Sequence, residues 1–138
     1  MAPLLSFPPV PLERLGLHEL GEIPFGPPYY QLYWQQRPVL TGRYFGAEGL
    51  WALAERYFFC EEWHTLDRGK GPITSLLAFD LVEQRQCVVS HATRGFIRPV
   101  RVEGTTLIYE KTFLDRGTTT EYERDIQTLS AWQPLYLS

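Results

Sequence analysis

One segment of the chain has the pattern of apolar residues expected of a buried helix. The stretch "GAEGLWALAERYFFCEEWH" (46–64) contains no proline, and its apolar residues would cover most of a helix circumference. Its acidic residues Glu48, Glu55 and Glu62 recur every seven positions as one polar stripe. Because a helix that is apolar nearly all round is normally buried, the pattern predicts a central buried helix over residues 47–63.

The period of the pattern changes to two after residue 72. Runs rich in β-branched and aromatic residues predict successive strands over residues 73–81, 86–91, 95–103, 105–113 and 118–129. In the last run, alternate positions would form one packed face and one solvated face. The stretches "LDRGKGP", "VEGTT" and "LDRGTT" predict turns.

The first 39 residues have a different character, since eight of the eleven prolines precede residue 40. Proline favours extended or turning chain, with room for a short helix over residues 11–20 and a strand over 29–35. Four aromatic rings within residues 29–34 indicate that this arm packs on the rest. We therefore expect one domain (1–138) of the α+β class: an antiparallel sheet wrapped round one central helix, with a proline-rich N-terminal arm over residues 1–39.

The composition and net charge of the chain limit the classes of partner that we expect. The chain has 138 residues, of which 44% are hydrophobic and 14% aromatic, and a net charge of −3 without a basic run. This balance argues against nucleic acid or an anionic membrane as a partner. The N-terminal stretch lacks a basic segment and is broken by prolines, so we expect no signal peptide and no membrane span. Two lone cysteines fit a reducing cytoplasm.

Both cysteines precede a histidine by four residues, Cys60 with His64 and Cys87 with His91. On the predicted helix the first pair shares a face and can hold a metal ion. On a strand the second pair spans about 13 Å, too far for one zinc ion unless the chain turns near Ser90. The alternative is that both cysteines are small core residues and that His64 complements the C-terminus of the helix. We favour this alternative and expect no structural metal, no disulfide and no cofactor.

A central helix followed by antiparallel strands resembles the hotdog fold of acyl-thioester enzymes. The stretch "GFIRPVRVEGTTLIYE" is similar to the R-F-x-x-P-V-x-x-G-D-x-L strand pair of hotdog thioesterases and dehydratases, and the matching positions are Phe96, Pro99, Val100, Gly104 and Leu107. The stretch "TGRYFGAEGLWAL" resembles the G-H-F-x-x-x-E entry into their central helix, on Gly42, Tyr44 and Glu48. Alternatively, "RPVLTG" matches the nearby R-P-V-x-P-G of the dehydratases.

The resemblance implies a site at the start of that helix. Arg43 stands where the dehydratases carry histidine, which disfavours histidine-based dehydration and makes Glu48 the carboxylate of the site. A helix N-terminus favours ionised Glu48 as a base or nucleophile. The expected catalytic residues are Glu48 and Arg43, and the expected substrate-binding residues are Tyr44, Phe45, Gly46, Ala47 and Trp51, with backbone N–H groups of Gly46 and Ala47 facing the oxyanion. Alternatively, Glu48 only complements the dipole, and Arg43 pairs with it or with a substrate phosphate or carboxylate.

The resemblance also implies a hydrolase or dehydratase for an acyl thioester of CoA or of a carrier protein. A module that binds an apolar ligand without reacting it, and an interaction domain that docks a partner through the aromatic arm, are the alternatives. We expect a homodimer, because the strand over residues 105–113 would otherwise leave an open sheet edge.

Overall fold

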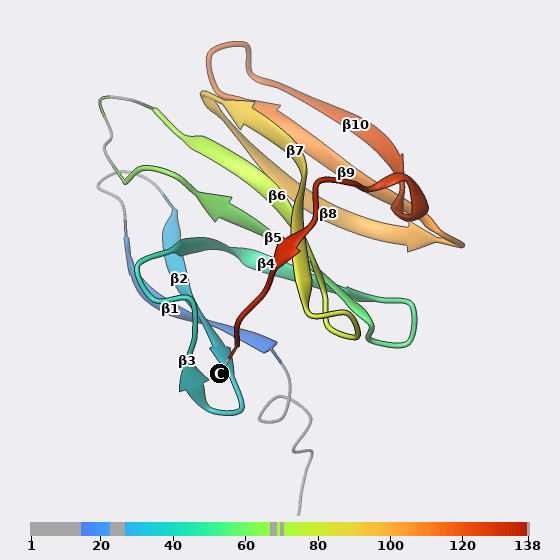
Figure 1. The fold of residues 1–138 in the computed structure, drawn as a ribbon. Coiled ribbons are helices and arrows are strands. Elements are labelled where there is room, and N and C mark those ends of the chain that lie inside the picture. Colours follow the sequence, from blue (N-terminus) through green and yellow to red (C-terminus); the bar gives the residue numbers. More distant parts are fainter. Residues whose placement is uncertain (1–14, 23–26, 67–68, 70, 138) are drawn as a thin grey trace, which may run out of the picture.

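A computed structural model describes residues 15–22, 27–66, 69 and 71–137, and in these ranges the chain is nearly all sheet (Figure 1). The strands are β1 (Leu15–Glu22), β2 (Pro28–Trp34), β3 (Arg37–Pro38), β4 (Tyr44–Ala52), β5 (Tyr57–Trp63), β6 (Ile73–Asp80), β7 (Arg85–Thr93), β8 (Gly95–Glu103), β9 (Thr106–Phe113), β10 (Thr118–Asp125) and β11 (Gln133–Pro134). A 3-10 turn, η2 (Ile126–Thr128), follows β10.

The strands form two sheets. The larger sheet has the order β1-β2-β4-β5-β6-β7-β11, with β3 also paired to β2, and the smaller has the order β10-β9-β8. All pairings are antiparallel. In Figure 1 the smaller sheet covers one side of β5–β7, and the C-terminal segment (red) runs from η2 to end beside β3. The fold is therefore two stacked sheets, closed at one side by the end of the chain.

The predicted central helix is wrong, and with it the α+β hotdog architecture. Residues 47–63 form the β4–β5 hairpin, whose strands pair up to Ala52 and Tyr57. Every residue of β5 is buried, because β5 is an interior strand that is covered on both faces. A strand buried on both faces has a continuous apolar run, and such a run cannot be told from a buried helix by periodicity alone.

The turn between β4 and β5 explains why the hairpin escaped prediction. Leu53, Ala54 and Glu55 all have positive φ, at 52°, 56° and 67°. Residues with a Cβ seldom adopt this left-handed region, and glycine or asparagine is the usual sign of such a turn. The sequence "ALAER" instead contains good helix formers, so its local preference points away from the turn that it forms.

The second half of the chain follows the prediction more closely. The structure places β6 to β10 over the predicted runs, with residues 126–129 of the last run leaving the strand at η2. The predicted strand over 29–35 corresponds to β2. The short helix expected over residues 11–20 is wrong from Leu15 on, where β1 begins; residues 11–14 lie outside the described part of the chain, as does most of the arm before them.

Two apolar clusters hold the sheets together, one on each face of β5 and β6. The upper cluster lies between the two sheets and includes Phe59, Leu76 and Ile97. The lower cluster lies on the opposite face, and includes Phe45 and Phe79 together with residues of β1, β2 and the C-terminal segment. Because successive residues of a strand point to opposite faces, β5 supplies both clusters.

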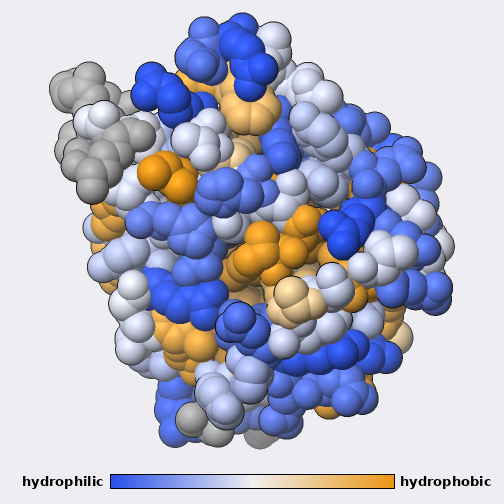
Figure 2. Space-filling view, turned by 45° about the horizontal axis from the view of Figure 1, so that its top comes forward, coloured by the Kyte–Doolittle hydropathy of each residue, from blue (hydrophilic) through white to orange (hydrophobic). Residues whose placement is uncertain are grey.

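Part of the apolar surface remains outside these clusters. Figure 2 shows a group of apolar residues near the middle of one face, surrounded by hydrophilic ones. The most exposed large hydrophobic residues of the described ranges come from separate elements, and Leu53, Val82 and Leu114 lie in hairpin turns. Single exposed residues of this kind need no partner to explain them.

The strand that motivated a homodimer is not an edge. β9 pairs with β8 on one side and with β10 on the other, over nearly its whole length. Its backbone groups are therefore satisfied within the chain, and the expected open edge is wrong as a reason for dimerisation. The homodimer itself stays a prediction. In the described ranges, no helix combines the length and the apolar character that crossing a membrane requires.

Candidate functional site

The structure separates the seven residues expected at the site. Gly46, Ala47 and Glu48 line one cavity together with Glu61, Trp63 and Phe96, whereas the other four residues lie elsewhere. The lining is completed by Pro27, Pro28 and Arg98. We call this the Glu61 cavity, after its most buried acidic residue. Its volume of about 210 Å³ is below the ~300–1,000 Å³ of pockets for drug-sized molecules, so it suits a ligand of the size of one substituted ring.

Arg43 and its neighbours have structural contacts instead. The guanidinium of Arg43 donates to both carboxylate oxygens of Glu62, at 2.7 and 2.9 Å, and to Gln86 at 3.1 Å. This group lines a separate depression of about 400 Å³. Tyr44 packs edge-on against a tyrosine of β2. The two remaining rings pack in or against the lower cluster: Phe45, which is fully buried, and Trp51.

A bulge in β4 creates the Glu61 cavity. The strand pairs with β5 up to Phe45 and again from Gly49. Between these points, residues 46–48 lie opposite Glu61 alone. Such bulges re-aim side chains and interrupt the ladder of hydrogen bonds. Here the interruption leaves an opening beside β5, and it brings Glu48 to the same cavity from a strand, not from the helix N-terminus that the sequence suggested.

Glu61 is fixed in this opening by two donors. The indole N–H of Trp63 donates to its Oε1 at 3.0 Å, and the backbone N–H of Ile97 donates to its Oε2 at 2.8 Å. The carboxyl group lies directly over Gly46, where an added Cβ would be 2.3 Å from Oε1. A side chain at position 46 would therefore displace the carboxyl group of Glu61, whose orientation is set by residues of β4, β5 and β8.

The surroundings of Glu61 favour its neutral form. Burial raises the pKa of Glu61 to about 7, and the nearby charge of Glu48 raises it further, against the opposing effect of the hydrogen bonds from Ile97 and Trp63. In the described part of the chain, no arginine or lysine forms an ion pair with Glu61. Buried charges in proteins are normally paired. Ionised Glu61 would therefore be an exception among the described residues unless a ligand supplied a cation.

The nearest arginine of the cavity is already engaged. Arg98 donates to Glu48 at 2.9 Å and to Glu110 on β9, and its side chain is about half exposed. Glu48 is likewise exposed. The lining of the cavity therefore carries the carboxyl groups of Glu48 and Glu61 and the guanidinium of Arg98, which Glu110 shares from outside the lining. With Glu61 ionised, the site has an excess of negative charge.

The walls of the Glu61 cavity are apolar. Trp63 and Phe96 lie 5.3 Å apart between ring centroids, inclined by 45°, and Pro27 and Pro28 also belong to the lining. Aromatic faces attract cations that come within about 6 Å of the ring centroid. The arrangement thus combines a buried carboxyl group with aromatic surface.

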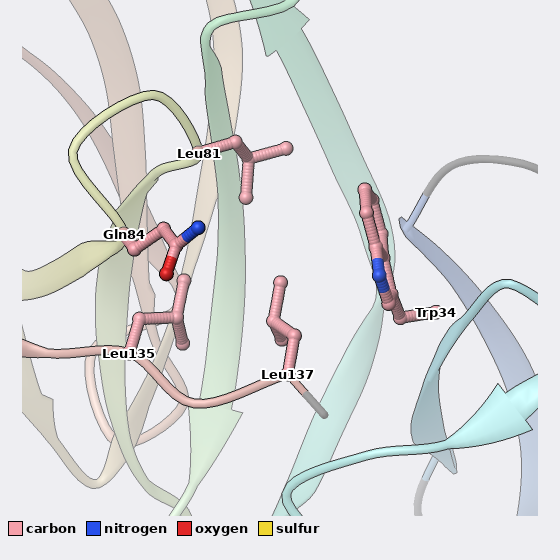
Figure 3. A pocket seen from close by; sticks show the side chains of 5 residues that line it. All are labelled: Trp34, Leu81, Gln84, Leu135 and Leu137. Atoms are coloured by element: carbon pink, nitrogen blue, oxygen red, sulfur yellow. The ribbon is translucent and has the colours of Figure 1, made fainter.

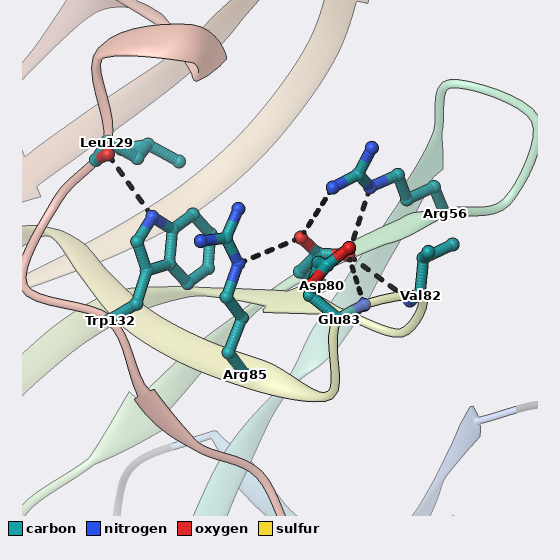
Figure 4. Close-up of polar contacts among 7 residues, drawn as sticks. All are labelled: Arg56, Asp80, Val82, Glu83, Arg85, Leu129 and Trp132. Carbon is teal, nitrogen blue, oxygen red and sulfur yellow. Dashed lines mark hydrogen bonds and ion pairs between the residues drawn. The ribbon is translucent and has the colours of Figure 1, made fainter.

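A second buried carboxylate, Asp80, shows what a structural site looks like in this protein (Figure 4). It accepts hydrogen bonds from Arg56 on both oxygens, at 3.0 and 2.9 Å, and from Arg85 at 3.0 Å. The backbone N–H groups of Val82 and Glu83 also donate to it, at 3.2 Å each. Although burial opposes ionisation, these contacts outweigh it and lower the pKa of Asp80. Asp80 links the β4–β5 and β6–β7 hairpins, and both of its carboxylate oxygens accept hydrogen bonds from cationic side chains.

A further depression lies under the C-terminal segment (Figure 3), with a volume of about 250 Å³. Figure 3 shows Leu135 and Leu137 of that segment on one side and Trp34 on the other, with Leu81 and Gln84 completing the lining. None of the described residues in this lining has an ionisable side chain. The depression follows the seam along which the end of the chain packs, so we do not regard it as the functional site.

The cysteines and histidines do not form one metal site. Cys60 belongs to the lower cluster and Cys87 to the upper, on opposite faces of the larger sheet. Burial raises the pKa of both thiols, that of Cys87 to about 11, and a metal ligand must be the thiolate. The described residues contain no cluster of three or more cysteine, histidine or acidic side chains suited to a metal ion. The two histidines, however, lie near each other.

Sequence reasoning missed Glu61, the residue on which the site depends. On the predicted helix, Glu61 would flank the polar stripe formed by Glu48, Glu55 and Glu62. The signal was present as two adjacent acids, Glu61 and Glu62, inside the apolar run "YFFCEEWH". In a strand, adjacent residues point to opposite faces, so two acids in a run this apolar place at least one carboxyl group in a buried environment.

Comparison of the chain with protein-family models, with curated proteins and with solved structures found no match. The function is therefore argued from the site alone.

Proposed function

We propose that this protein binds a small organic cation in the Glu61 cavity. The observation that carries the proposal is a buried carboxyl group, held in place by two donors, with a raised pKa and no cationic partner among the described residues. The proposal develops the binding-module alternative. Thioester chemistry was expected through the hotdog resemblance, and its central helix is absent from the described ranges.

Charge and shape support a cation over a neutral or anionic ligand. A cationic group that reaches Glu61 would supply the missing ion pair, and hydrogen bonds to charged groups contribute about 1.5–3 kcal/mol. Trp63 and Phe96 line the same cavity, and aromatic rings attract cations at close range. An anion would meet Glu61 and Glu48 without compensation, since Arg98 is engaged by two carboxylates.

Binding and proton release are linked in this proposal. Free Glu61 has a pKa of about 7, and the cation pairs only with the ionised form. Below pH 7 the ligand must therefore displace a proton, and its affinity falls as the pH falls. Well above pH 7 the carboxyl group is already ionised, so the affinity becomes independent of pH.

Three probes that share one ring test the proposal: benzamidinium, benzamide and benzoate. We expect benzamidinium to bind at least about tenfold more tightly than benzamide, because the charged hydrogen bond is worth at least ~1.4 kcal/mol, and we expect benzoate not to bind. Between pH 5 and pH 7 the affinity for benzamidinium should rise by up to about tenfold per pH unit. Isothermal titration calorimetry in buffers of different ionisation enthalpy measures both the affinity and the proton released.

The matched control is Glu62→Gln, because Glu62 is the next residue along β5 and pairs with Arg43 away from the cavity. The Glu61→Gln variant should lose the preference for benzamidinium over benzamide, whereas Glu62→Gln should keep it. Equal affinities of the parent for benzamidinium and benzamide at pH 8, or an equal loss in both variants, would contradict the proposal.

A second substitution tests the geometry without altering any charge. In Gly46→Ala the new methyl group would be 2.3 Å from Oε1 of Glu61, so the carboxyl group must move and lose a donor. We expect benzamidinium affinity to fall at least about tenfold, the equivalent of one hydrogen bond to a charged group. Gly16→Ala is the control, because nothing lies within 4 Å of the added methyl group there. Undiminished binding by Gly46→Ala would show that the ligand does not depend on Glu61 as positioned here.

A further inference from the structure

The two histidines that follow the cysteines come together at one serine. His64 follows the last residue of β5, His91 lies on β7, and Ser75 lies between them on β6, directly paired with His91. The Nε2 atom of His64 is 2.7 Å from the hydroxyl oxygen of Ser75, and the Nδ1 atom of His91 is 3.1 Å from the same oxygen. The ring centroids are 6.0 Å apart.

The hydrogen bonds fix the direction in which both rings point. A serine hydroxyl has one proton and can donate it to only one imidazole, so the other imidazole must donate to the oxygen. One nitrogen of each ring is therefore directed at the same point. Ser75 is buried, whereas His64 and His91 are exposed. The rings are thus convergent and accessible to solvent.

We propose that His64 and His91 form a binding site for a divalent transition-metal ion, distinct from the Glu61 cavity. Neutral imidazole is a preferred ligand of Cu²⁺, Ni²⁺ and Zn²⁺, with Cu²⁺ the strongest in the general order of affinities. The two nitrogens are directed at one point, where they share the hydroxyl of Ser75. The bound ion replaces these two hydrogen bonds, which requires the two exposed rings to turn from the hydroxyl to the shared ion, and water completes the coordination. The ion binds to a folded site and exchanges with solvent; it is not a structural metal.

The same geometry would also place a base next to a serine nucleophile, but neither histidine has the carboxylate partner that this use requires among the described residues. In serine hydrolases a carboxylate orients the imidazole. Within the described ranges, neither His64 nor His91 is hydrogen-bonded to a carboxylate; the additional contact of His91 is with the hydroxyl of Thr93, at 3.5 Å. The backbone of His91 is held by Lys111, which donates to its carbonyl oxygen at 2.9 Å.

The experiment is a Cu²⁺ titration of the full chain without a histidine tag, followed by calorimetry and by electron paramagnetic resonance. We expect one ion per chain with two imidazole nitrogens in its coordination sphere. His64→Gln and His91→Gln should each weaken binding by at least about tenfold, and Ser75→Ala by about tenfold, as for other groups that orient a ligand. The control is His18→Gln, since His18 packs against Tyr33 on another part of the sheet and should not affect binding.

A second measurement does not depend on the variants. Addition of Zn²⁺ should shift the imidazole resonances of His64 and His91 and leave those of His18 in place. Equal shifts of all three histidines, unchanged Cu²⁺ affinity in His64→Gln, or covalent labelling of Ser75 by a fluorophosphonate would each overturn the metal site.

Discussion

Between pH 5 and pH 8 the parent protein should lose about 3 kcal/mol of unfolding free energy relative to the Glu61→Gln variant. Folding raises the pKa of Glu61 to about 7, whereas an unfolded glutamate titrates near 4.3. Each unit of pKa difference corresponds to about 1.4 kcal/mol. The comparison is made as a change with pH because glutamine also loses one of the two donor contacts of Glu61, and that loss is the same at every pH.

The sign of this effect follows from the protons bound. Between about pH 4.3 and pH 7 the folded state holds a proton on Glu61 that the unfolded state has released. Stability therefore decreases as the pH rises through this window and levels off above pH 7. Urea denaturation at several pH values measures it. The exposed residue Glu123 on β10 provides the control: Glu123→Gln should track the parent. A parent and a Glu61→Gln variant with parallel pH profiles would show that Glu61 ionises normally.

The Asp80→Asn variant should be less stable than the parent by about 3 kcal/mol at pH 7. Removing one partner of a buried ion pair costs about 3–5 kcal/mol, and we expect the lower end because the side chains of Arg56 and Arg85 are more than one third exposed. Asparagine can accept on one oxygen only, so it cannot hold both arginines and the turn N–H groups of Val82 and Glu83.

The pH dependence of Asp80 has the opposite sign to that of Glu61. Its folded pKa is lowered, so its contribution is present above the unfolded value of about 3.9 and is lost as the pH falls through the folded value. Thermal unfolding at pH 7 and below pH 4 measures both. Asp115→Asn, in the exposed turn after β9, is the control and should change stability by less than about 0.5 kcal/mol. A stability loss of that small size in Asp80→Asn would show that the Asp80 contacts do not hold the two hairpins.

These two carboxylates illustrate a division between stability and binding. Asp80 is buried with cations, and its ionisation stabilises the fold. Glu61 is buried without a cation among the described residues, and its ionisation destabilises the fold. Binding sites commonly retain such unfavourable arrangements because the ligand supplies the missing interaction. The lack of a cation beside Glu61 within the described ranges distinguishes the candidate site from the structural contact.

Two local features of the sequence predict the β8–β9 hairpin. Both strands have β-branched and aromatic residues, and Gly104 in the turn adopts a positive φ of 62° that glycine tolerates without strain. The β4–β5 hairpin was not predictable in the same way. Its second strand lacks a regular alternation of apolar and polar residues, and its turn places Leu53, Ala54 and Glu55 in the left-handed region that their side chains disfavour.

Only three residues of the cavity were expected at a site, and the structural reason for their position differs from the one that the sequence suggested. Gly46, Ala47 and Glu48 were expected near a ligand because of a helix N-terminus, and they line a cavity because β4 bulges there. Glu61 faces that cavity through the alternation of β5, which a helical reading of residues 47–63 conceals. Which residues share a site depends on the pairing of strands that are distant in sequence. The local conformational preference of each segment does not predict this pairing.

The central claim is that the buried carboxyl group of Glu61 binds a cationic ligand. The most direct measurement is a carbon-13 NMR titration of its side-chain carboxyl resonance, with and without saturating benzamidinium. The account predicts a pKa of about 7 in the free protein and a lower value in the complex, because the cation stabilises the ionised form. A pKa near 4.3 in the free protein, or a value that benzamidinium leaves unchanged, would contradict it.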